Sequence, residues 1–145
     1  LSGAVSEYVA QGRRSLIQVV LRALMYIVAS RVAEKYGYDA IVTGESIGQT
    51  SSQTLHNLRI AEKLSSPTVP IIRPLVGFDK EDSVRLSRKL GLYELSSKTI
   101  EFSAVVRGPV VTRAEESILE DALRRLGARE EISRRCLNPE IFELA

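Results

Sequence analysis

Apolar residues recur at helical spacing over the first part of the chain. Between residues 12 and 36 they fall three and four positions apart, which predicts a long amphipathic helix that Gly37 closes at its C-terminal end. The same spacing predicts a second helix over residues 52–64, which the Ser-Ser-Pro sequence at 65–67 interrupts. Two packed helices are therefore expected before the middle of the chain.

Short apolar runs alternate with these helices. Residues 38–43 and 69–73 are rich in side chains that favour strands, and Pro74 ends the second run. Asp79 is placed to cap a further helix that continues through Lys89. Because strands and helices alternate, we predict an α/β fold: part of a parallel, Rossmann-like sheet flanked by helices in three layers, α/β/α.

The C-terminal part of the chain adds a short predicted strand over residues 105–111 and a helix over 113–126. The composition, 44% hydrophobic and 26% charged, is typical of a globular protein. We therefore predict a single domain over residues 1–145, with 105–145 as an extension that packs on it. The predicted strands are few for such a sheet, so an uncovered sheet edge is expected.

A loop rich in small and hydroxylated residues, TGESIGQTSSQT at 43–54, follows the first predicted strand. Gly44 and Gly48 permit a close approach of a ligand to the backbone, and the N-terminus of the next helix attracts anions. Ligands of open α/β sheets bind at this end of the strands. An ordinary polar connection between strand and helix explains the composition equally well. The candidates for the helix cap are Ser51, Ser52 and Thr54.

Three segments resemble motifs of one family. TGESIGQTSSQTLHNL, from residue 43, resembles the signature of the tRNA 4-thiouridine synthetases, the ThiI-like tRNA sulfurtransferases. RPLVGFDKED at 73–82 is similar to the RPL...DK.E motif of that family, and KLGLYE at 89–94 is similar to its K-IGTYE motif. The motifs occur in the family's order, and the resemblance covers roughly residues 14–96.

The resemblance implies the adenine nucleotide α-hydrolase, or PP-loop, fold and an ATP-dependent activity. Such enzymes adenylate a uridine of tRNA before a persulfide sulfur displaces AMP, in 4-thiouridine synthesis and in the thiazole branch of thiamine synthesis. ATP, with or without Mg²⁺, is the implied cofactor. The residues carried over for ATP are Arg22, Gly44 and Gln53, and the further candidates in the same loop are Glu45, Ser46 and Gln49.

Two of these residues have alternative interpretations. Arg22 lies between apolar neighbours on the predicted helix, so it either extends to the surface or points at a ligand phosphate. Glu45 is either a simple turn residue or a group that helps to hold a metal ion on ATP phosphates. Asp79 and Lys80 match motif positions without an assigned role.

The chain departs from the family pattern in ways that bear on activity. No SGGxDS sequence, which wraps the pyrophosphate in the family, is present; the nearest sequence is LSGAV at residues 1–5. The family cysteine is also missing, because residues 100–104 read IEFSA. The only cysteine, Cys136, is an improbable persulfide carrier in this position. We expect the chain alone to be inactive; the alternative is a non-catalytic nucleotide-binding or assembly module.

Partners and location follow from composition and from the incomplete sheet. A net charge of +2 does not by itself indicate RNA binding, and we expect tRNA to bind only with additional domains. No apolar run is long enough for a membrane helix, and a single cysteine fits a cytoplasmic protein. We predict binding of ATP or AMP, and either a homodimer or a complex with an N-terminal PP-loop half.

Overall fold

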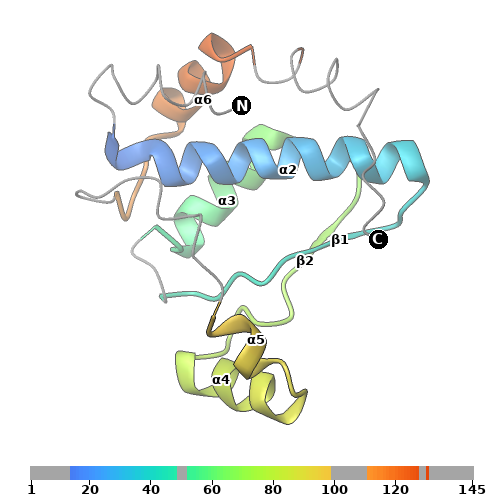
Figure 1. The fold of residues 1–145 in the computed structure, drawn as a ribbon. Helices are drawn as coiled ribbons and strands as arrows, with labels where there is room; N and C mark the ends of the chain where they lie inside the picture. The colour runs from blue at the N-terminus through green and yellow to red at the C-terminus, as the bar shows by residue number, and fades with distance from the viewer. Residues whose placement is uncertain (1–13, 49–51, 99–110, 128–129, 131–145) are drawn as a thin grey trace.

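Helix α2 (Ile17–Tyr36) runs across the molecule (Figure 1), and two later helices and the first strand contact it. The computed structural model describes residues 14–48, 52–98, 111–127 and 130. A short 3-10 turn, η1 (Arg14–Leu16), leads into α2. Gly37 ends the helix with φ of 69°, a left-handed conformation that glycine adopts without strain. The predicted helix and its C-terminal glycine are confirmed.

The two described strands form a parallel pair. β1 (Ile41–Val42) and β2 (Ile71–Ile72) pair residue for residue, and helix α3 (Leu55–Ser65) connects them. Both strands lie inside the predicted runs, 38–43 and 69–73. Each strand is shorter than its run, because only two residues in each run form regular pairs with the other strand. The parallel strand, helix and strand order confirms the predicted α/β fold.

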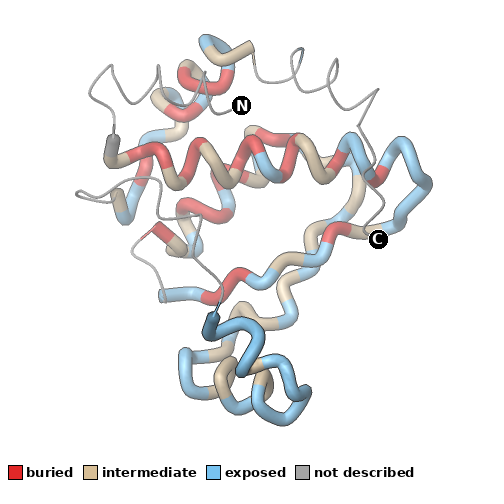
Figure 2. Tube along the Cα trace, viewed as in Figure 1, coloured by how far each residue is buried: buried red, intermediate tan, exposed pale blue. Residues whose placement is uncertain are grey.

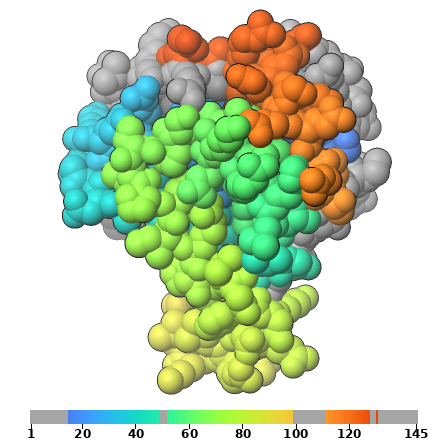
Figure 3. Space-filling model, turned by 180° about the vertical axis from the view of Figure 1, so that it is seen from behind, coloured from blue at the N-terminus to red at the C-terminus, as the bar shows by residue number. Residues whose placement is uncertain are grey.

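Helices lie on two sides of the strand pair. α2 and α3 lie on one side, while α4 (Lys80–Lys89) and α5 (Tyr93–Ser96) form a lobe on the other (Figures 1 and 3). No residue of that lobe's two helices is buried (Figure 2). The arrangement is the predicted three-layer order. The sequence did not predict α5, because the apolar spacing weakens after Gly91.

Helix α4 begins with the predicted cap. The Asp79 carboxylate accepts a hydrogen bond from the backbone N–H of Asp82 at 2.7 Å, and the Asp82 carboxylate accepts one from the N–H of Asp79 at 3.4 Å. Two N–H groups that the helix itself leaves unpaired are therefore satisfied.

We predict that Asp79→Ala lowers the stability of α4 by about 1 kcal/mol, because one of these N–H groups loses its acceptor. Amide hydrogen exchange within α4 measures the effect. Glu81→Ala is the matched control, since Glu81 lies in the same first turn without serving the capping box. Equal effects of the two substitutions would contradict the capping role.

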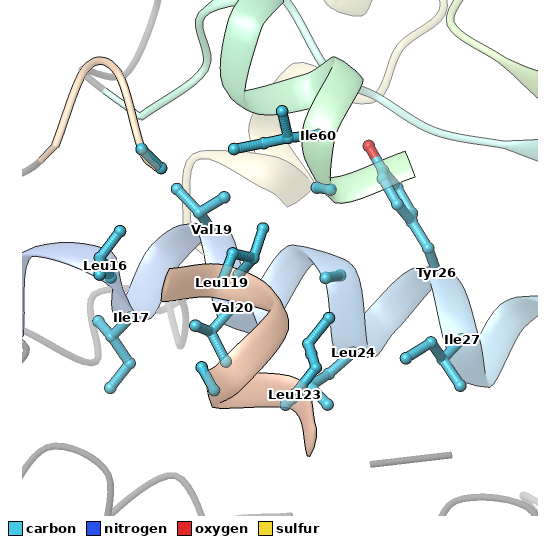
Figure 4. Close-up of a cluster of buried hydrophobic side chains, with 14 residues drawn as sticks. Leu16, Ile17, Val19, Val20, Leu24, Tyr26, Ile27, Ile60, Leu119 and Leu123 are labelled. Atoms are coloured by element: carbon cyan, nitrogen blue, oxygen red, sulfur yellow. The ribbon is translucent and has the colours of Figure 1, made fainter. Parts of the chain in front are cut away.

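The hydrophobic core lies where α2 meets α3 and α6 (Glu116–Arg125) (Figure 4). Five inward residues were predicted for the last helix: Leu119, Ala122 and Leu123 are buried, and Ile118 and Leu126 are partly buried against the core. This prediction is confirmed. The predicted strand at 105–111 falls outside the described residues except for Val111, so its existence and the extension over 105–145 stay predictions.

One face of the strand pair carries exposed apolar side chains. Ile41 is buried and Ile71 packs against the core, whereas their neighbours Val42 and Ile72 are 67% and 49% exposed. Side chains alternate between the two faces of a sheet, so Val42 and Ile72 share the outer face. Among the described residues this face is incompletely covered, and the expected uncovered sheet edge stays a prediction.

Candidate functional site

The loop after β1 is fixed to the connection that follows β2. The N–H of Thr43 donates to the carbonyl of Ile72 at 3.0 Å, which continues the strand pairing by one hydrogen bond. The Ser46 hydroxyl then donates to the carbonyl of Phe78 at 2.6 Å, and the N–H of Ile47 donates to the carbonyl of Val76 at 3.2 Å. Two of the family motifs are thus held side by side by the backbone.

Helix α3 begins close to this loop. Of the three cap candidates, Thr54 is the N-cap: its hydroxyl accepts from the N–H of Asn57 at 3.2 Å. The turn closes through the N–H of Gly48, which donates to the carbonyl of Gln53 at 3.1 Å, with Gly48 at φ of 80°. Gln53 is therefore placed next to the end of the loop. The candidate Gln49 lies outside the described residues.

Beneath the loop lies a charged cluster centred on Glu45, which is buried. The Arg22 Nε lies 2.6 Å from Oε1 of Glu45, and the Arg73 Nε donates to Oε2 at 2.9 Å. The Tyr26 hydroxyl is 2.6 Å from both carboxylate oxygens, and the Thr43 hydroxyl donates to Oε2 at 3.0 Å. The cluster joins α2 to the ends of both strands.

The surroundings keep Glu45 ionised. Burial alone raises the pKa of its carboxyl, but hydrogen bonds from Tyr26 and Arg73 and the charge of Arg22 outweigh this, and the pKa lies below its usual value. Burial and the hydrogen bond to Glu45 raise the pKa of the Tyr26 phenol far above its usual value. Tyr26 therefore stays protonated and donates to a carboxylate.

A cavity of about 470 Å³ opens between α2 and the end of β1. Arg22, Gly44, Glu45 and Gln53 all line it, together with Tyr26. Its lining also includes Gln18, Leu21, Met25, Ala29, Ile41, Val42 and Thr43. The expected convergence of Arg22, Gly44 and Gln53 on one cavity is therefore found, while their assignment to ATP stays a prediction.

The cavity wall shows what these residues can do. A Cβ atom added to Gly44 would meet no atom within 4 Å, so the space beside its backbone is open to a ligand. The Arg22 side chain is only 12% exposed. The interpretation in which Arg22 extends to the surface is therefore wrong. Its Nη1 is buried without a hydrogen-bond partner among the described residues. Ser46, by contrast, is buried and donates to Phe78.

Sequence reasoning missed two members of the cluster, Tyr26 and Arg73. Tyr26 follows Arg22 by one helical turn, so the two side chains share a face of α2. Arg73 opens the second family motif at the end of β2, the edge at which ligands of parallel sheets bind. These positional signals place both residues near the candidate site, but they do not predict their contacts with Glu45.

Other site types find no support in the part of the chain that the structure describes. It contains no group of three or more Cys, His, Asp or Glu side chains placed to hold a metal ion. Every helix there is too short or too polar to span a bilayer. Cys136 lies outside the described residues.

The sequence is similar to those of known proteins. The family model described as thiamine biosynthesis protein (ThiI) matches residues 2–126. A tRNA sulfurtransferase of Desulfurococcus amylolyticus is 50% identical over 112 residues, which are 77% of this chain and 23% of that protein. A probable tRNA sulfurtransferase of Sulfurisphaera tokodaii is 43% identical over 108 residues, 74% of this chain and 29% of that protein.

A solved structure gives the same result. The crystal structure of a 4-thiouridine synthetase–RNA complex with bound ATP matches with a TM-score of 0.68 and 37% identity, over 83% of this chain and 32% of that chain. The chain thus spans 23%, 29% and 32% of the lengths of these relatives. Because the family model covers most of the chain and the fold agrees, the resemblance of the three motifs is confirmed, and the chain belongs to the ThiI family.

Proposed function

We propose that this chain is the C-terminal half of the PP-loop domain of an ATP-dependent tRNA sulfurtransferase, and that its cavity binds the adenine nucleotide. The observation that carries the proposal is the convergence of Arg22, Gly44 and Gln53 on one cavity at the end of β1. The structural relative with bound ATP supports the choice of ligand. Parallel sheets bind nucleotides at this end of their strands.

The lining suits a nucleotide chemically. Arg22 supplies a cation and N–H donors, Gln53 supplies an amide that both donates and accepts, and Gly44 leaves room for the ligand beside its backbone. Leu21, Met25 and Ala29 provide an apolar wall for a base. In the proposed role these residues bind and orient the nucleotide, and ATP supplies the activating chemistry.

We do not assign Mg²⁺ to Glu45. Both of its oxygens are held by Tyr26, Arg22 and Arg73, so a cation would have to displace two guanidinium groups. We propose that any Mg²⁺ that accompanies ATP binds the phosphates rather than Glu45.

The proposed activity needs an N-terminal half that carries SGGxDS, in the same polypeptide or a separate one. The exposed apolar face at Val42 and Ile72 supports such an addition, because further sheet and helices would cover it. A second copy of this chain is the alternative occupant. tRNA, the polynucleotide substrate, is proposed to bind through further domains of the complete enzyme.

We predict that ATP and AMP bind to the chain. Adding a polypeptide with the SGGxDS half should lower the dissociation constant of ATP at least tenfold, because it restores contacts with the phosphates. Calorimetric titration of the chain, alone and with that polypeptide, measures both affinities. GTP is the control for base selectivity. Absence of adenine-nucleotide binding in both settings would contradict the proposed function.

A non-catalytic nucleotide-binding module is the second candidate, and the missing family cysteine favours it. Turnover separates the two candidates. If the SGGxDS half restores ATP-dependent release of pyrophosphate with tRNA present, the chain is part of an enzyme. Binding of ATP without pyrophosphate release in the same mixture supports the non-catalytic module.

A further inference from the structure

The Glu45 carboxylate has no hydrogen-bonding capacity left for a ligand. Tyr26, Thr43 and Arg73 donate hydrogen bonds to its two oxygens within 3.0 Å, and the Arg22 Nε forms an ion pair with Oε1 at 2.6 Å. A carboxylate offers about four acceptor sites, so these four side chains occupy its two oxygens. Although Glu45 lines the cavity, its part there is to hold other side chains.

The Arg22 guanidinium group has one nitrogen paired with Glu45 and one buried nitrogen without a partner among the described residues. Its Nε pairs with Glu45 at 2.6 Å, whereas its Nη1 is buried and has no acceptor among the described residues. A buried N–H without an acceptor costs free energy, and an acceptor atom on a ligand would remove that cost. The cavity that Arg22 lines is where such a ligand would lie.

The other arginine of the cluster differs in this respect. The Arg73 Nε donates to Glu45, and its Nη2 pairs with Glu62 at 2.8 Å and donates to the Tyr26 hydroxyl at 3.1 Å. Arg73 also lies over the Tyr26 ring, 5.6 Å from its centre. Arg73 is thus engaged by protein groups through two of its nitrogens, whereas Arg22 has a buried donor without an acceptor among the described residues.

We propose that Glu45 and Tyr26 are positioning residues that fix the Arg22 guanidinium at the cavity wall, with its Nη1 left to donate to an acceptor atom of the bound nucleotide. The inference rests on the proposed function for the identity of the ligand. The cluster of Arg22, Arg73, Glu45 and Glu62 is neutral in sum, so the acceptor need not be a phosphate. Comparing adenosine with AMP separates a base or ribose acceptor from a phosphate.

The first measurement needs no ligand. The Arg22 Nε–H signal in an NMR spectrum of the ¹⁵N-labelled chain is expected to exchange slowly with water, because the Nε is ion-paired with Glu45 at 2.6 Å and the side chain is only 12% exposed. In Glu45→Gln its exchange should be at least tenfold faster, since the carboxylate charge that holds the guanidinium group is lost. In Glu62→Gln, which removes a partner of Arg73 but none of Arg22, it should not change.

The second measurement is the dissociation constant of AMP for the same proteins. Glu45→Gln should weaken AMP about tenfold and Tyr26→Phe a few-fold, while Glu62→Gln leaves it unchanged. Circular dichroism shows which variants are folded. If Glu45→Gln does not fold, Tyr26→Phe, which removes only one hydroxyl, takes its place in the affinity measurement. A purely structural cluster would lower the melting temperature of the variants without moving the affinity of the folded protein.

The outcomes separate the two proposals. Unchanged exchange of the Arg22 signal, or unchanged AMP affinity, in folded Glu45→Gln overturns the positioning role. If the parent chain binds no adenine nucleotide with or without the SGGxDS half, the proposed function fails, and with it the assignment of the ligand. Faster exchange in Glu45→Gln would even then establish that Glu45 holds Arg22.

Discussion

Replacement of Asn57 by alanine is expected to destabilise the protein by about 3 kcal/mol or more. Asn57 is fully buried. Its side-chain amide donates to the carbonyls of Ser52 and Val111, and its oxygen accepts from the N–H of Ala114 at 2.9 Å. Alanine would leave three backbone groups without partners, and each buried unsatisfied group costs about 1–3 kcal/mol.

Asn57 matters because it joins segments that are distant in the sequence. It ties the start of α3 to residues 111–114, which lead into α6 and its part of the core. Urea unfolding followed by circular dichroism measures the loss. His56→Ala is the matched control, since His56 makes a single hydrogen bond, at 2.9 Å, to the carbonyl of Ala114. A loss for Asn57→Ala no greater than that of the control would contradict the proposed anchoring.

Glu45→Gln is expected to destabilise the protein by about 3–5 kcal/mol, the usual cost of removing one partner from a buried ion pair. Arg22 and Arg73 would both lose the carboxylate that compensates their charges. Arg31 and Glu34 form the control pair: their side chains are exposed on α2, and Nη1 of Arg31 lies 2.8 Å from Oε2 of Glu34. Glu34→Gln should cost far less, because water screens this exposed pair. Urea unfolding at neutral pH compares the two variants.

The ion pairs of Glu45 with Arg22 and Arg73 predict that the stability of the protein depends on pH. The pKa of Glu45 is lowered in the folded state, so its contribution to stability is present above the unfolded-state pKa and is lost as pH falls through the folded-state pKa. The difference in unfolding free energy between the parent protein and Glu45→Gln should therefore shrink in acid. A difference that stays constant from neutral pH to below pH 3 would show that the carboxylate charge is not responsible.

The sequence predicted the elements whose signals are local. The spacing of apolar residues gave α2, α3 and α6, and single residues marked two helix ends, Gly37 and Asp79, as the structure confirms. The parallel pairing of β1 and β2 followed from the alternation of strands with helices. The extent of the strands was wrong, because strand length depends on a partner that the sequence does not show, and helix α5 was not predicted.

The sequence did not predict contacts between side chains that are distant along the chain. Glu45 was interpreted as a turn residue or a metal ligand, since nothing local indicates that Tyr26 and Arg73 meet it. Asn57 was not among the predicted residues, and two of its three partners, Val111 and Ala114, lie more than fifty positions away. Such contacts come from the packing of whole elements, and no spacing rule within one element reveals them.

The most direct test of the nucleotide site is an NMR titration of the ¹⁵N-labelled chain with AMP. We predict that the amide signals of Gly44 and Gln53 and the side-chain signal of Arg22 shift most, because all three line the cavity at the end of β1. Signals of Lys63 and Glu120, which line a separate cavity between α3 and α6, should not move. Shifts centred on Lys63 and Glu120, with Gly44 and Gln53 unchanged, would contradict the site.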